Sequence, residues 1–158
     1  MDLRNVNMRE AVDAQILDSK LRGLKWISCL QPNNPKKEIS QLLEVIDIIK
    51  KDKRNKSIIT DYQFISVILS LYDFSPSQLW FINHVVLEKK ESKHFKKYKQ
   101  LFINQLKENK IKIVYVIKPF WQSNEVFEEG LSKNCMKKMR ITEILDGYLL
   151  QPCEELKN

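Results

Sequence analysis

Residues that could bind a ligand follow two apolar runs of the sequence. Together they supply an acid, a base and aromatic rings. Asp61 and Tyr62 follow the first run, Lys118 and Trp121 follow the second, and Trp80 lies between them in the chain. A carboxylate, an ammonium group and aromatic faces together suit a sugar or a nucleobase. We interpret these five residues as candidate ligand-binding residues. The alternative is that Asp61 caps the next helix and that the tryptophans pack a loop onto the core.

A second chemical feature is the lysine-rich segment at 88–112, which holds nine lysines and three glutamates, a net charge of +6. Such a segment could contact the phosphates of anionic lipid headgroups or of nucleic acid. The chain has only five arginines, whereas readers of nucleic-acid sequence favour arginine forks and interleaved aromatic rings. Nucleic acid is therefore a disfavoured partner, and an ordinary solvated helix face is the other alternative. The candidates for contact with an anionic surface are Lys93, Lys96, Lys97 and Lys107.

Cysteine and histidine usage argues against metal or nucleophilic chemistry. Cys29, Cys135 and Cys153 form no Cys-x-x-Cys pair, and the chain has only two histidines. Neither a Gly-x-Ser-x-Gly motif nor a Walker motif occurs. We therefore expect no metal, no cofactor and no catalytic residue. The cysteines are interpreted as free, mostly buried thiols, with a Cys135–Cys153 disulfide as the alternative in an oxidising compartment.

Length and composition predict one globular α/β domain that spans residues 1–158. Apolar residues make up 43% of the 158 positions and charged residues 30%, and the formal net charge is +7. No apolar stretch approaches the roughly 18–20 residues of a membrane helix. The first residues also lack the apolar core of a signal peptide. The sequence as it stands therefore predicts a soluble domain.

Helical and strand periodicities alternate along the chain. Spacing of apolar residues predicts helices at 14–22, 35–51, 62–72 and 93–109, with short helices at 124–129 and 142–145. Asn34 and Pro35 are suited to begin the second of these helices. Apolar runs predict strands at 24–28, 57–60, 111–117 and 148–150, whereas the segment 78–86 fits either a strand or a short helix.

This alternation predicts a small three-layer, Rossmann-like α/β sandwich with a mainly parallel central sheet. Right-handed crossovers would make the strands at 57–60 and 111–117 parallel and central. Ligands of open parallel sheets bind beyond the carboxyl ends of the strands. The five candidate ligand-binding residues would then line one crevice at that edge.

Several stretches in succession resemble the soluble C-terminal region of certain bacterial multi-spanning membrane glycosyltransferases. These enzymes are described as dolichyl-phosphate-mannose–protein mannosyltransferase-like or lipid-linked aminoarabinose transferase-like. The resemblance covers most of residues 12–118 and rests on overall pattern, not on a catalytic motif. The stretches that carry it are Asn-Pro-Lys-Lys-Glu-Ile at 34–39, Ser-Ile-Ile-Thr-Asp-Tyr-Gln-Phe-Ile-Ser at 57–66, Phe-Ser-Pro-Ser at 74–77, Lys-His-Phe-Lys-Lys-Tyr at 93–98 and Ile-Val-Tyr-Val-Ile at 113–117.

The resemblance implies that the chain is one domain of a larger membrane protein. Its role would be that of a non-catalytic accessory domain on the periplasmic side of the bacterial inner membrane. The parent enzyme would transfer a sugar from a polyprenyl-phosphate donor, and this domain would recognise the acceptor or the lipid donor. Its partners would be the membrane-embedded part of the parent, anionic lipid headgroups or the polyprenyl-phosphate donor. No catalytic residue is carried over, and Asp61 does not match one.

Two other classes of function remain open from the residues alone. The first is a stand-alone cytoplasmic Rossmann-like module that binds a nucleotide or sugar nucleotide, which thermal stabilisation by a nucleotide would reveal. The second is a nucleic-acid binder, whose affinity would fall steeply with salt. The donor sugar, the acceptor and the oligomeric state are not specified by the sequence.

Overall fold

The computed structural model describes residues 7–28, 33–60, 62, 64–70, 93–118, 128 and 130–156. Within these ranges the helices are α1 (Pro35–Lys51), α2 (Phe64–Leu69) and α3 (Phe95–Glu108). The strands are β1 (Val12–Asp13), β2 (Lys25–Trp26), β3 (Lys56–Ile59), β4 (Ile113–Ile117), β5 (Met136–Arg140) and β6 (Leu145–Leu150). Short 3₁₀ turns complete the described elements: η2 (Met8–Glu10), η3 (Ala14–Ile16), η4 (Ser19–Leu21), η5 (Lys133–Cys135) and η6 (Glu154–Leu156).

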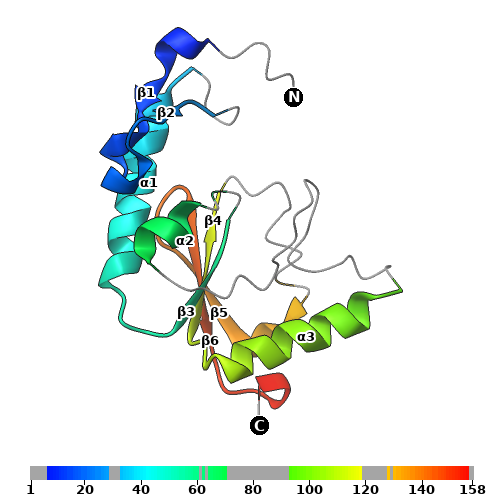
Figure 1. Cartoon of the computed structure of the whole chain (residues 1–158). Coiled ribbons are helices and arrows are strands. Elements are labelled where there is room, and N and C mark those ends of the chain that lie inside the picture. Colours follow the sequence, from blue (N-terminus) through cyan, green and yellow to red (C-terminus); the bar gives the residue numbers. More distant parts are fainter. Residues whose placement is uncertain are drawn as a thin grey trace.

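The main sheet has the strand order β3-β4-β6-β5 and is mixed (Figure 1). β3 and β4 are parallel, with Ile58 opposite Tyr115, which confirms the predicted pairing of the two apolar runs. β4 pairs antiparallel with β6, and β6 pairs antiparallel with β5. β4 is central, whereas β3 lies at one edge of the sheet as far as the described residues show. β1 and β2 form a separate two-stranded antiparallel sheet.

This topology overturns the predicted three-layer Rossmann-like sandwich with a mainly parallel sheet. Only one of the three strand pairings in the main sheet is parallel. The reason lies in the last quarter of the chain. There β5 and β6 form an antiparallel hairpin, and β6 in turn pairs antiparallel with β4. Residues 142–144 form the turn of that hairpin and Leu145 begins β6, so the predicted short helix at 142–145 is wrong. Ile141 N donates a hydrogen bond to Leu145 O, and Leu145 N donates one to Thr142 Oγ1.

α1 forms as its sequence predicts. The side chain of Asn34 accepts a hydrogen bond of 3.0 Å from Lys37 N, and Pro35 occupies the first turn, where its missing N–H costs nothing. Lys50 and Lys51 lie in the last turn, which the helix dipole favours. The buried stripe of the helix contains Ile39, Leu42, Val45, Ile46 and Ile49.

Two apolar cores cover opposite faces of the sheet. On one face, α1 and α2 pack with Ile113, Tyr115 and Ile117 of β4. On the other, α3 packs with Val114 and Val116 of the same strand. The alternation of β4 residues between the two cores explains why all five are buried.

The amino-terminal segment packs beside α1 (Figure 1). The predicted helix at 14–22 is instead two short 3₁₀ turns, η3 and η4, capped by the side chains of Asp13 and Asp18. Each of these aspartate side chains accepts a hydrogen bond from the backbone N–H two residues further on. Such local hydrogen bonds favour short turns over a continuous helix. Gly23 follows with a φ of +85°, the left-handed conformation that its position after the turn requires.

Candidate functional site

The structure places Tyr62 and Lys118 on different faces of the sheet, so these two do not line one crevice. Tyr62 is buried among the residues of the α1 core. The ammonium group of Lys118 forms an ion pair with Asp146 of β6. Successive residues of a strand point to opposite faces of the sheet, so Asp146 lies on the face opposite its neighbour Leu145, which belongs to the α1 core. Asp146 therefore shares its face with Tyr148, on the side that α3 covers. Asp61, Trp80 and Trp121, the other three candidate ligand-binding residues, lie outside the described residues.

Tyr62 belongs to a cluster around the buried carboxylate of Glu38, which is 1% exposed. Its oxygens accept hydrogen bonds from Tyr62 Oη at 2.7 Å, from Trp26 Nε1 at 3.0 Å and from Ser28 Oγ at 2.7 Å. The rings of Trp26 and Phe64 meet edge to face at a centroid distance of 4.9 Å. Three neutral donors therefore hold a carboxylate that joins the amino-terminal segment, α1 and Tyr62, three residues after β3. This cluster is a structural junction, because the donors come from the protein itself.

Sequence reasoning missed Glu38, although a signal was present. Glu38 falls on the same helical stripe as Pro35, Leu42 and Ile49, all of which are buried. A glutamate within an apolar stripe must find hydrogen-bond donors in the core, because an unpaired buried carboxylate is costly.

Asp146 is the second buried carboxylate, also 1% exposed. It lies on β6 between Val116 of β4 and Arg140 of β5, its cross-strand neighbours. Lys118 Nζ approaches Asp146 Oδ2 to 2.8 Å, and Lys118 N donates a backbone hydrogen bond of 2.7 Å to Ile144 O. Lys118 thus closes the carboxyl end of β4 against the β5–β6 hairpin. The sequence pattern concealed this partner because Asp146-Gly147 looks like a turn rather than a strand.

Next to Asp146 on the same face, Tyr148 and Lys138 converge on Glu128. Tyr148 Oη donates to Glu128 Oε1 at 3.0 Å, and Lys138 Nζ donates to the same oxygen at 2.7 Å. Burial by itself would raise the pKa of Glu128, but these two hydrogen bonds outweigh it and the pKa is lowered. Burial and the hydrogen bond to Glu128 raise the pKa of Tyr148. The carboxylate therefore stays charged and the phenol neutral near pH 7.

On this face of β6, the ring of Tyr148 is buried in the same core as α3, whereas its hydroxyl group and the carboxylate of Asp146 make polar contacts. Every carboxylate in this group has a cationic partner within the protein. No group of three or more histidine, cysteine, aspartate or glutamate side chains suited to a metal occurs among the described residues.

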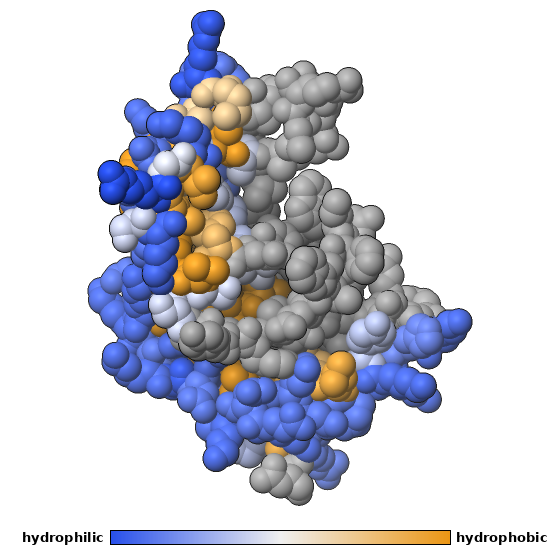
Figure 2. Space-filling view, in the orientation of Figure 1, coloured by the Kyte–Doolittle hydropathy of each residue, from blue (hydrophilic) through white to orange (hydrophobic). Residues whose placement is uncertain are grey.

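Part of the lysine-rich segment, Phe95–Glu108, forms α3, and the outer face of this helix is cationic as predicted. Lys93, Lys96 and Lys97 are exposed, whereas Lys107 is half-buried. Apolar spacing in the sequence predicts that Tyr98 and Leu101 face the core together with Phe102 and Leu106, but Tyr98 is 36% exposed and Leu101 is 50% exposed. The buried positions are Phe102, Ile103 and Leu106, so the helix is turned further than the sequence pattern indicated. In the space-filling view the surface over α3, at the lower right, is mostly hydrophilic with an apolar patch within it (Figure 2).

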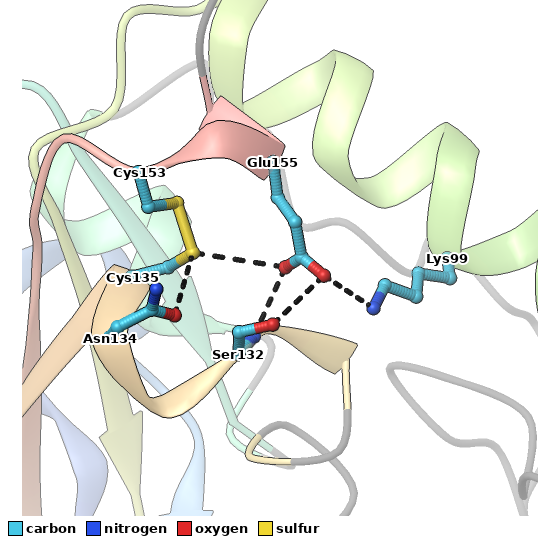
Figure 3. Close-up of a disulfide and its surroundings, with 6 residues drawn as sticks. All are labelled: Lys99, Ser132, Asn134, Cys135, Cys153 and Glu155. Carbon is cyan, nitrogen blue, oxygen red and sulfur yellow. Dashed lines mark hydrogen bonds and ion pairs between the residues drawn. A yellow bond between two sulfur atoms is a disulfide. The ribbon is translucent and has the colours of Figure 1, made fainter.

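A disulfide joins Cys135 to Cys153, which corrects the interpretation of these two residues as free thiols. Cys29, the third cysteine, lies outside the described residues. The bond fixes the C-terminal segment beside α3, where Glu155 accepts hydrogen bonds from Lys99 Nζ at 2.9 Å and from Ser132 N and Oγ, both at 3.0 Å (Figure 3). Cys135 Sγ lies 3.8 Å from Glu155 Oε2. Burial alone would raise the pKa of Glu155, but Lys99 and Ser132 lower it.

Comparisons with known proteins add no relative. No protein-family model matches the sequence, and no curated protein or solved structure is significantly similar to it. Among the helices of the described residues, none combines the length and the hydropathy that crossing a membrane requires.

Proposed function

We propose that this chain is a non-catalytic accessory domain of a bacterial membrane glycosyltransferase, exposed on the periplasmic side of the inner membrane. Its role there is to recognise the acceptor or the polyprenyl-phosphate-linked donor for the membrane-embedded part of the parent enzyme. The observation that carries the proposal is the Cys135–Cys153 disulfide. Structural disulfides persist in oxidising compartments such as the periplasm and are rare in the cytosol.

The sequence resemblance to the C-terminal region of these enzymes supports the same location. Two observations argue against the alternative, a cytoplasmic Rossmann-like module that binds a nucleotide or sugar nucleotide. Its parallel sheet is replaced by a mixed one, and its compartment would keep the two cysteines reduced.

The test has two parts. The open reading frame that contains this chain should encode about eight or more hydrophobic segments of roughly 20 residues each. Deleting the part of that frame that encodes these 158 residues should then abolish transfer of the lipid-linked sugar, while the remaining protein is still inserted into the membrane. A frame without hydrophobic segments would contradict the proposal.

The location is tested separately in intact cells. Cys135 and Cys153 should resist a membrane-impermeant maleimide until a reductant is added, and should then both react. Labelling that needs lysis but no reductant would indicate a cytoplasmic dithiol.

A further inference from the structure

The amino-terminal half of α3 carries positive charge that the described part of the protein does not neutralise. Among the described residues, Lys93, Lys96 and Lys97 have no ion-pair partner. Some lysines elsewhere in the described ranges do form ion pairs, as Lys51 does with Asp47 and Lys99 with Glu155. As far as the described residues show, the exposed end of α3 is therefore a cationic surface without acidic partners.

This charge lies where the helix itself disfavours it. The first turn of α3 contains no acidic residue, yet Lys96 and Lys97 fall within it. The positive end of the helix dipole is at that turn, so cations there lower the stability of the helix. A local cost of this kind is typical of residues retained for binding.

Two apolar side chains lie within this cationic surface. Tyr98 and Leu101 are three positions apart and so lie on neighbouring parts of the helix surface, with Lys97 directly before Tyr98. Leu101 is half exposed, and Tyr98 combines an apolar ring with a polar tip. A helix that combines lysines with exposed leucine and tyrosine has the composition of one that lies in a membrane interface.

The inner side of α3 is fixed, which makes the outer side a stable platform. Phe102, Ile103 and Leu106 are buried against the sheet. Lys99 is held by Glu155, whose segment is attached through the disulfide (Figure 3). α3 can therefore present its outer face without refolding.

We propose that the surface formed by Lys96, Lys97, Tyr98 and Leu101 of α3, together with Lys93 just before the helix, docks onto an anionic lipid bilayer. The lysines contact headgroup phosphates, and Leu101 and Tyr98 enter the boundary between headgroups and acyl chains. Nucleic acid is a poorer match, because a phosphodiester backbone offers nothing for the exposed leucine. The inference deepens the proposed function, since it names the surface by which an accessory domain would rest on the membrane.

The experiment is flotation of the whole 158-residue chain with phosphatidylcholine vesicles, with and without phosphatidylglycerol. The protein should float only with the anionic vesicles. The double variant Lys96→Gln/Lys97→Gln should lose binding roughly 25-fold, because each lysine near an anionic surface contributes about fivefold. Leu101→Ser should lose binding roughly three- to tenfold through its apolar contact.

α1 supplies matched controls. Leu43 on α1 is also exposed, at 36%, and Lys36 and Lys50 are exposed on the same helix. Leu43→Ser and Lys36→Gln/Lys50→Gln should bind as the wild-type chain does. Thermal unfolding of each variant shows that it is folded, and all four substituted lysines and both leucines lie at the surface.

Three outcomes would overturn the proposal. These are equal flotation with neutral and anionic vesicles, no flotation at all, and equal losses in the α1 and α3 variants. A chain that ignores vesicles but binds duplex DNA, with no effect of Leu101→Ser, would assign the surface to nucleic acid instead. Each of these failures leaves the open-reading-frame test of the proposed function to be decided separately.

Discussion

Tyr115, in the central strand β4, donates a hydrogen bond of 2.7 Å from its hydroxyl group to Asp52 Oδ2, at the residue that ends α1. Asp52 also accepts hydrogen bonds from Arg54 N and Nε, each at 2.9 Å. The backbone carbonyl of Asp52 accepts a further hydrogen bond from Lys56 Nζ. One carboxylate thus connects the end of a helix, the following turn and the middle of the sheet.

This connection should make stability depend on acid pH. Burial by itself would raise the pKa of Asp52, but the hydrogen bonds from Arg54 and Tyr115 outweigh it and lower the pKa to about 2 from 3.8. A lowered pKa in the folded state stabilises the protein above about pH 4, and this contribution is lost as the pH falls through about 2. The contribution is about 2 kcal/mol. Urea unfolding from pH 7 to pH 2 measures it.

Asp52→Asn is the matched variant, because it keeps the shape and removes the charge. It should be less stable than the wild-type chain at pH 7 and equal to it near pH 2. Tyr115→Phe should cost about 1–2 kcal/mol at pH 7 through loss of the hydrogen bond. A difference between wild type and Asp52→Asn that stays constant with pH would contradict the assignment.

The hydrogen bond between Tyr115 and Asp52 should also make stability depend on alkaline pH. Burial and the hydrogen bond to Asp52 raise the pKa of Tyr115 to about 12. A raised pKa in the folded state favours folding below about pH 10, and that contribution is lost as the pH rises through about 12. Tyr115→Phe removes this alkaline loss, which urea unfolding between pH 9 and pH 11 would detect. An unchanged alkaline profile in the variant would argue against the raised pKa.

The elements that the sequence predicts well are those in which local signals agree. α1 has a cap, a proline and an apolar stripe that all specify the same boundaries, and β4 is a nearly continuous β-branched run. The strand β5 was missed because Lys137, Lys138 and Arg140 give it no apolar face in the sequence. Those side chains are exposed, and β5 is held by its backbone pairing with β6. A strand of this kind is specified by its partner, not by its own residues.

The site residues follow the same logic. Lys118 is a candidate from the sequence because it follows an apolar strand, and whether it binds a ligand stays a prediction. Its partner Asp146 is contributed by β6 across an antiparallel pairing that local patterns do not encode. Tyr62 was found next to Asp61, but its hydroxyl group is used by Glu38, 24 positions earlier in the chain. Pairings across the sheet and between segments far apart decide these contacts, and a single sequence does not reveal them.

The disulfide should contribute substantially to stability. It closes a loop with a sequence separation of 18, and removal of such a constraint costs about 3 kcal/mol. Cys135→Ser/Cys153→Ser should therefore unfold at a melting temperature lower by roughly 10 °C. Calorimetry in the absence of reductant measures the difference.

The effect should also be local. Glu155 and its contact with Lys99 depend on the attached C-terminal segment, so hydrogen exchange in α3 should rise in this variant. Wild-type protein with reductant should behave as the double variant does, and a reductant effect that persists in the double variant would point to another cause.

The Glu38 cluster should control how firmly the amino-terminal segment is attached. Glu38→Ala leaves the donor groups of Trp26, Ser28 and Tyr62 without their carboxylate, and each buried donor so exposed costs about 1 kcal/mol or more. We expect a loss of about 3 kcal/mol. Glu38→Gln should recover only part of it, because an amide keeps one acceptor oxygen and adds a donor.

The readout that separates this role from a general loss of stability is local. Hydrogen exchange at Val12 and Trp26, which pair in the small sheet, should accelerate more than exchange in β4. Glu44→Ala, an exposed change on the same helix, is the control. Equal acceleration in both sheets would mean that Glu38 acts on the whole fold.

The Lys118–Asp146 pair should behave as a coupled unit at the carboxyl end of the central strand β4. Asp146 is almost fully buried, whereas about a third of the Lys118 side chain is exposed. Removing the lysine alone leaves a buried carboxylate without its cation, so Lys118→Met should cost about 2 kcal/mol, less than for a fully buried pair because solvent still reaches the site. Asp146→Asn should cost less, since Lys118 can turn to water.

The double variant should then be more stable than the sum of the two single losses predicts, and urea unfolding of all four proteins measures this coupling. Additive losses would mean that the 2.8 Å contact contributes no energy, and that Asp146 is held in β6 by its other contacts alone.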